Sequence, residues 1–137
     1  MGCVQMKYLL DTHTWVWWNM APEKLSSRTR AAIEQTEQYT EILLSAISPW
    51  EFCKLLEKGR IGISCDPEEW MSEALRMPKL RLVPLTPKVC CRSTMLPAPF
   101  HDDPVDQIIV ATAREENATI LSKDRLIRDY PHARTIW

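Results

Sequence analysis

Residues 103–122 read DPVDQIIVATAREENATILS, and this stretch decides the fold. Residues 103–117 predict a helix, because Asp103 fits the N-cap position and Pro104 the first helical position. The apolar run that follows, residues 118–122, predicts a short buried strand. Helices and strands that alternate in this way are typical of α/β folds.

The same alternation extends along the whole chain. Strands are predicted at 7–11, 41–48, 80–85, 118–122 and 133–137, and helices at 12–20, 26–38, 49–58, 66–77, 87–96, 103–117 and 124–130. The strands are apolar throughout instead of half polar, which is typical of a parallel sheet covered on both faces. We therefore predict an α/β protein, a three-layer α/β/α sandwich with a central parallel sheet.

Length and composition favour one cytoplasmic domain. We expect a single domain over residues 6–137, preceded by a short extension, residues 1–5, before the second methionine. We see no secretory leader, and no apolar run approaches the ~20 residues of a membrane span, so we expect no membrane contact. The five cysteines are odd in number and form no CxxC pair, which indicates reduced thiols that mostly fill the core.

Net charge and glycine content argue against several other functional classes of protein. The formal net charge of −1 argues against a surface that coats nucleic acid broadly, but it leaves room for a local basic patch. With only three glycines, the chain has no glycine-rich phosphate loop, which argues against kinases and dinucleotide-binding domains.

Most acidic residues of interest have an ordinary structural explanation. Glu51 completes a capping box, S-x-x-E, that begins at Ser48. Asp103 fits an N-cap, and Asp106 then lies in the first helical turn, where the helix dipole favours a negative charge. Asp124 precedes another short helix and is also a candidate N-cap. Capping explains each of these acids separately.

Capping does not explain why the acids would share one edge of the sheet. Asp11 ends an apolar strand, where burial makes a charge costly unless it is paired. Asp11 and Asp124 both belong at the carboxyl ends of strands, where ligands bind in open α/β sheets. Glu51 and Asp106 lie in first turns of helices near that edge. Converging carboxylates repel each other, and Mg²⁺ or Mn²⁺ would offset that repulsion.

Four segments, in order along the chain, together resemble the PIN-domain nucleases of the VapC toxin type. LLDTHTWVWW resembles the family's opening strand and first acid, and SAISPWEFCKLLEKGRI resembles its second-acid segment. FHDDPVDQIIVATA resembles the third-acid motif, and ATILSKD the final strand with the fourth acid. The resemblance runs from about residue 6 to the end of the chain.

The resemblance implies a metal-dependent endoribonuclease that is the toxin of a type II toxin–antitoxin pair. Its cofactor would be Mg²⁺ or Mn²⁺, its substrate RNA, and its partner a small antitoxin that occludes the site, with a homodimer also allowed. The implied catalytic and metal-binding acids are Asp11, Glu51, Asp106 and Asp124. Asp103 is a further candidate, as an N-cap that also touches the waters of the metal.

Residues around the acids suggest supporting roles. Thr12 and Ser122 could hydrogen-bond the acids and orient them. Nearby cations could hold RNA phosphates, although an ordinary solvated surface explains them equally well. These cations are Lys54, Lys58, Arg60, Lys123 and Arg125. The tryptophans at 15, 17 and 18 cannot all lie on one face of the first helix, so we expect at least one of them at the surface, for a partner or a base, and Trp50 begins another helix.

Two other functions remain open at the level of sequence. One is a non-catalytic α/β binding domain whose acids are helix caps. The other is a related metal-dependent DNA nuclease or phosphatase, because a metal site can attack the phosphodiester of RNA or DNA. RNA is preferred on the resemblance alone.

Overall fold

A computed structural model describes residues 6–35 and 40–137 of the protein. Five strands form one sheet in the order β3-β2-β1-β4-β5, and every neighbouring pair is parallel. The strands are β1 (Met6–Leu10), β2 (Thr40–Ser45), β3 (Leu80–Val83), β4 (Thr119–Leu121) and β5 (Thr135–Ile136). The predicted parallel sheet is thus confirmed.

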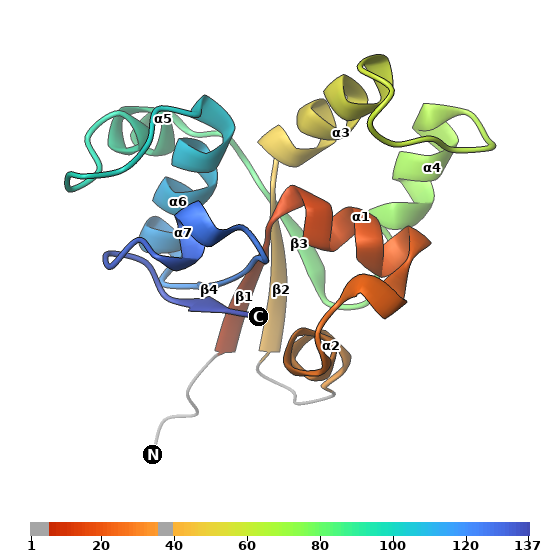
Figure 1. Ribbon diagram of the computed structural model, residues 1–137, viewed down its shortest axis with the longest axis horizontal. Helices are drawn as coiled ribbons and strands as arrows, with labels where there is room; N and C mark the ends of the chain where they lie inside the picture. Colours follow the sequence, from red (N-terminus) through yellow and green to blue (C-terminus); the bar gives the residue numbers. More distant parts are fainter. Residues whose placement is uncertain (1–5, 36–39) are drawn as a thin grey trace.

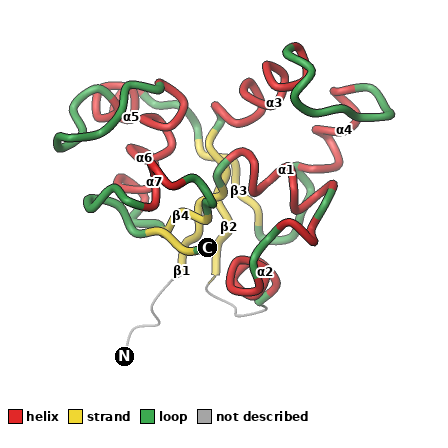
Figure 2. Tube along the Cα trace, viewed as in Figure 1, coloured by secondary structure: helices red, strands yellow, loops and turns green. Residues whose placement is uncertain are grey.

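Helices cover both faces of this sheet. Figure 1 shows α1 to α4 on one side and α5 to α7 on the other, and Figure 2 shows the strands as the layer between them. Their bounds are α1 (Thr12–Met20), α2 (Ser27–Glu34), α3 (Ile47–Glu57), α4 (Pro67–Ala74), α5 (Pro87–Ser93), α6 (Pro104–Glu116) and α7 (Arg125–Arg128). A 3₁₀ helix, η1 (Pro22–Lys24), was not predicted. The arrangement is the expected three-layer α/β/α sandwich.

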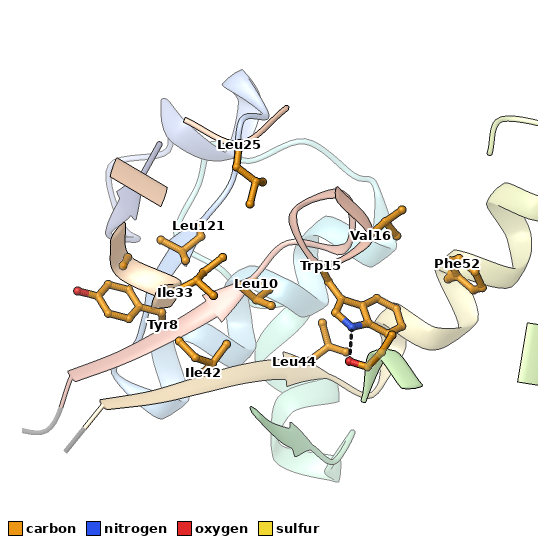
Figure 3. Close-up of a cluster of buried hydrophobic side chains, with 12 residues drawn as sticks. Tyr8, Leu10, Trp15, Val16, Leu25, Ile33, Ile42, Leu44, Phe52 and Leu121 are labelled. Carbon is orange, nitrogen blue, oxygen red and sulfur yellow. Dashed lines mark hydrogen bonds between the residues drawn. The ribbon is translucent and has the colours of Figure 1, made fainter. Parts of the chain in front are cut away.

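The strands are apolar because they are buried on both faces. Successive residues of a strand point to opposite faces, so Leu10 packs toward α1 while Leu9 packs toward α6. Figure 3 shows the first of these two clusters, in which Trp15 of α1 lies fully buried beside Leu44. The indole Nε1 of Trp15 donates to the carbonyl oxygen of Ala74 at 3.2 Å, which satisfies its only polar group.

Several predicted boundaries were wrong. α3 begins at Ile47, not at Pro49, and β2 accordingly ends at Ser45 instead of 48. The helix predicted over 26–38 ends at Glu34, and positions 36–38 lie outside the described residues, as does the predicted extension 1–5.

The core-filling role of the cysteines was also wrong where the structure describes them. Cys53, Cys65, Cys90 and Cys91 are free thiols with exposed side chains. They lie on the outer sides of helices or in a loop, positions that composition alone does not reveal. Cys3 lies outside the described residues.

The strand order creates the place for a binding site. β1 pairs with β2 on one side and with β4 on the other, so the chain leaves the carboxyl end of β1 at a point where the connections diverge. Ligands bind at such switch points in open α/β sheets. Within residues 6–35 and 40–137, every helix is too short or too polar to cross a lipid bilayer.

Candidate active site

Asp11 stands at the carboxyl end of the central strand and is held by two hydrogen bonds. Leu10 of β1 is in register with Leu121 of β4, which brings Asp11 next to Ser122. The Ser122 hydroxyl donates to Asp11 Oδ2 at 2.7 Å, and the Thr12 backbone N–H donates to Oδ1 at 2.8 Å. Asp11 is only 7% exposed, so its carboxylate is both buried and fixed.

Ser122 and Thr12 also connect to the other acidic segments, as expected for supporting residues. The Ser122 hydroxyl accepts a hydrogen bond of 3.0 Å from the backbone N–H of Asp124. The Thr12 hydroxyl lies 2.8 Å from the hydroxyl of Ser48 in α3, and its hydrogen bond to Glu51 stabilises that carboxylate. The Ser122 hydroxyl therefore connects Asp11, at the end of β1, to the start of α7, and the Thr12 hydroxyl connects α1 to α3.

The start of α6 presents two acids in different roles. The carboxylate of Asp103 is the N-cap and accepts from the backbone N–H of Asp106 at 3.0 Å. The Asp106 carboxylate instead contacts His101, whose Nε2 lies 2.7 Å from Oδ2. The sequence did not reveal the contact between His101 and Asp106. The only signal for it was that the two residues lie five positions apart.

Of the N-caps predicted for α7 and α3, the structure confirms the first and not the second. Asp124 is the N-cap of α7 and accepts from the backbone N–H of Leu126 at 2.9 Å. The capping box of Ser48 and Glu51 is wrong, because α3 begins at Ile47 and its N-cap, Ala46, has no side-chain cap. Glu51 is therefore free of a capping role.

The structure brings the predicted acids to one open pocket of about 510 Å³. Its lining is acidic with one lysine and two aromatic rings. The residues are Asp11, His13, Trp17, Glu51, Asp103, Asp106, Lys123 and Asp124. Four segments far apart in the sequence thus converge as the sequence predicted.

Burial and mutual repulsion disfavour the charged state of these acids. Burial is the main cause that raises the pKa of Asp11 and of Glu51. Burial also raises the pKa of Asp106 to about 7, assisted by the negative charges of Asp11 and Asp103 and opposed by the bond to His101. A cation in the pocket would stabilise all three carboxylates.

The donor set suits a hard divalent cation. Carboxylate oxygens are the ligands that Mg²⁺ and Mn²⁺ prefer. In the part of the chain that the structure describes, no three acidic, histidine or cysteine side chains lie close enough to hold one ion directly. Mg²⁺ keeps several waters and takes one or two protein carboxylates. The pocket therefore fits a hydrated ion instead of one enclosed by protein ligands.

The predicted RNA-binding cations are spread over three places. Lys123 lines the acidic pocket, and Arg125 lines a neighbouring pocket. Lys54 pairs with Glu57 at 2.9 Å, and Lys58 and Arg60 are exposed after α3 without lining either pocket.

The tryptophans also separate by environment. Trp15 is buried, while Trp17 is half-buried at the acidic pocket. Trp50 is 52% exposed, and the Lys54 ammonium lies 5.7 Å from its ring centroid. Of the three tryptophans of α1, Trp17 and Trp18 are half-buried and reach the surface only in part, while the exposed Trp50 belongs to α3.

A parallel α/β/α sandwich with acids at the switch point of its sheet is an open α/β fold with a ligand-binding site at the carboxyl ends of its strands. The model of the PIN domain family matches residues 8–133, and the chain belongs to this family. It is 35% identical over 131 residues to Ribonuclease VapC22 of Mycobacterium tuberculosis, a match that covers 94% of this chain and 97% of that protein. The VapC-type resemblance is thereby confirmed.

Solved structures support the same fold. VapBC2 from Rickettsia felis, bound to a DNA fragment from the promoter, aligns with a TM-score of 0.65 at 18% identity, over 96% of this chain and 98% of that one. FitAcB from Neisseria gonorrhoeae aligns with a TM-score of 0.64 at 18% identity, over 94% and 96% of the two chains. At this identity the likeness concerns the fold alone.

Proposed function

We propose that this VapC-type chain is an endoribonuclease that uses its acidic pocket to hold Mg²⁺ or Mn²⁺ and to hydrolyse phosphodiester bonds of RNA. One observation carries the proposal: acids from four distant segments line a single pocket at the switch point of the sheet. The activity follows from the relationship to a VapC ribonuclease over nearly the whole chain.

Four carboxylates would hold the hydrated ion, one or two of them directly and the others through its waters, namely Asp11, Glu51, Asp106 and Asp124. Asp103 would contact waters of the ion while it caps α6. When bound, such an ion lowers the pKa of water, orients it toward the phosphodiester and stabilises the leaving oxygen.

The side chains around the acids keep them in position. The Ser122 hydroxyl and the Thr12 backbone N–H fix both oxygens of Asp11, so this carboxylate does not turn away from the pocket. His101 fixes one oxygen of Asp106 in the same way. Lys123 is the lysine of the lining, and its positive charge would attract the phosphate toward the acids.

We also propose an antitoxin partner. Structures with this fold include toxin–antitoxin complexes, among them one from Klebsiella pneumoniae. By analogy, this chain would be the toxin of a type II pair, blocked by a small antitoxin, and a homodimer is compatible with the same role. We place it in the cytoplasm, where its described cysteines would remain free thiols.

The test is cleavage of RNA with and without metal. Wild-type protein should cut RNA with Mg²⁺ or Mn²⁺ and not with EDTA. Asp106→Asn should lower the rate by more than about 100-fold, because even hydrogen-bond partners of metal ligands are worth about 10–100-fold. Asp102→Asn is the matched control, since this neighbouring carboxylate is exposed and does not line the pocket.

The alternatives give different outcomes. If Asp106→Asn cuts RNA as fast as wild type, the assignment of the site is wrong. Equal cleavage of a DNA strand of the same sequence would make the protein a general metal-dependent nuclease. If neither nucleic acid is cut and Mn²⁺ does not bind, the acids have only structural roles, such as the caps of Asp103 and Asp124, in a non-catalytic binding domain.

A further inference from the structure

A second pocket, lined by three arginines, lies beside the acidic one. It has a volume of about 240 Å³. Arg28 comes from α2, and Arg125 and Arg128 come from α7. The remaining lining residues are Asp129, Thr135 and Trp137. We call this site the arginine pocket.

The three guanidinium groups have no partner in the part of the chain that the structure describes. Within the described residues, none of them makes a side-chain hydrogen bond or an ion pair, not even with Asp129 in the same lining. Six other arginines do contact a carboxylate or a carbonyl oxygen, namely Arg30, Arg76, Arg81, Arg92, Arg114 and Arg134. The side chains that line the pocket thus include three positive charges and one negative charge, and an anionic ligand would offset the repulsion between the arginines.

The arginine pocket and the acidic pocket are immediate neighbours. Asp124 lines the acidic pocket, and Arg125, the next residue, lines the arginine pocket. Trp17 of the acidic pocket packs edge-to-face on Trp137 of the arginine pocket, with ring centroids 6.0 Å apart. In Figure 1 the C-terminal end of the chain lies between α7 and α2, the two helices that supply the arginines.

Positive charge and an aromatic ring continue between the two pockets. The ammonium of Lys123 lies 5.9 Å from the centroid of the Trp17 ring, and that of Lys24 lies 5.8 Å from it. Bases stack on aromatic side chains, and basic side chains follow the backbone, in proteins that bind single-stranded nucleic acid. Lysine, arginine and tryptophan side chains, the types that such proteins use, therefore lie next to one another across the two pockets.

We propose that the arginine pocket binds a backbone phosphate of the RNA strand that is cut in the acidic pocket. The inference rests on the proposed ribonuclease function and names the contact that positions the substrate. Arginine suits this role because its planar guanidinium can form two parallel hydrogen bonds to a phosphate. Trp17 would stack on a base between the bound phosphate and the cleaved one.

The test is RNA binding without metal, so that no strand is cut. Fluorescence anisotropy would follow a labelled single-stranded RNA of about 12 nucleotides in EDTA, a length in the range that such sites cover. The variants are Arg28→Gln, Arg125→Gln and Arg128→Gln, singly and combined. Arg76→Gln is the matched control, because it removes one positive charge from an exposed residue just after α4 that pairs with Glu73.

We expect the combined variant to bind RNA about 10–100-fold more weakly and the slope of log K against log salt to fall by ~0.7, the value for one phosphate contact with a single strand. Arg76→Gln should bind as wild type does. The inference is wrong if the combined variant keeps wild-type affinity, or if Arg76→Gln loses as much. It is also wrong if the combined variant binds RNA normally but loses a glutamate-rich peptide, since the pocket would then serve a protein partner.

Cleavage with Mn²⁺ separates this inference from the proposed function. If both hold, the combined variant should raise KM and leave kcat nearly unchanged, because the contact exists before and during the reaction. Wild-type protein that binds RNA through the arginines but never cuts it would overturn the ribonuclease proposal and leave the arginine pocket standing. An unchanged KM in the combined variant would overturn the arginine-pocket inference and leave the ribonuclease proposal standing.

Discussion

At the scale of single residues, His101 is the contact that most affects the proposed site. Its Nε2 lies 2.7 Å from Asp106 Oδ2, in a half-buried position, so it restricts the orientation of that carboxylate. We expect His101→Ala to lower kcat/KM for RNA by about 10–100-fold, the usual effect of losing a partner of a metal ligand. The melting temperature should change little, and steady-state kinetics with Mn²⁺ would measure the loss.

Two further variants test whether His101 acts by orienting the Asp106 carboxylate or whether the loss of any imidazole lowers the activity. His101→Gln keeps a hydrogen-bond donor and should recover part of the activity. His132→Ala removes an exposed histidine that does not line the acidic pocket and should leave activity unchanged. If His101→Ala keeps full kcat/KM, the hydrogen bond to Asp106 has no role in orienting that acid.

At the scale of secondary-structure elements, Asp103 combines a cap with a place in the pocket. Its carboxylate accepts from the backbone N–H of Asp106 and begins α6. We expect Asp103→Ala to lower the free energy of unfolding by about 1 kcal/mol, the usual value for an N-cap, while Asp103→Asn should restore most of it. Urea denaturation would measure both.

A matched helix start provides the control for this prediction. Asp66 caps α4 through the same Asp-Pro sequence and lies outside the acidic pocket. Asp66→Ala should therefore lower stability by a similar amount and leave Mn²⁺ affinity unchanged. If Asp103→Asn weakens Mn²⁺ binding as much as Asp106→Asn does, then Asp103 is a direct ligand and not mainly a cap.

Helix starts also show how much the sequence could predict. The Asp-Pro starts of α4 and α6 were predicted correctly, because an N-cap bond joins residues two or three apart. The start of α3 was wrong, because the Ser48 hydroxyl bonds Thr12, 36 residues away, and is therefore not a cap. Ser45 instead accepts from the backbone N–H of Ile47.

The same distinction applies to the residues of the acidic pocket: positions fixed by local sequence or by parallel strands were predictable, and contacts between distant segments were not. The convergence of Asp11 and Asp124 was predictable, because parallel strands end at one edge of the sheet. The contact between His101 and Asp106 was not, because it depends on the path of a loop. The arginine pocket was missed because α2 and α7 lie about a hundred positions apart in sequence and no local pattern joins them.

At the scale of the whole molecule, the acidic pocket should make stability depend on pH. Burial raises the pKa of Asp11 and Glu51, and that of Asp106 to about 7. Between the ordinary value of 3.8 and about 7, the folded protein binds protons that the unfolded chain releases. Folding is therefore favoured at the acid end of this window, and that contribution is lost as pH rises through 7.

We expect the metal-free protein to melt a few degrees lower at pH 8 than at pH 6, with about 2–5 °C attributable to the pocket. Asp106→Asn should flatten the curve, because it removes the carboxyl group whose pKa burial raises to about 7. Mn²⁺ should act in the opposite direction, because it binds the ionised carboxylates and stabilises the protein more at pH 8. Melting curves of both proteins at pH 6 and pH 8, with EDTA or Mn²⁺, measure the pH effect and the metal effect.

A wild-type curve in EDTA that runs parallel to that of Asp106→Asn would contradict this prediction. It would mean that the pocket carries no buried, uncompensated charge, and the main electrostatic reason for a metal ion there would be lost.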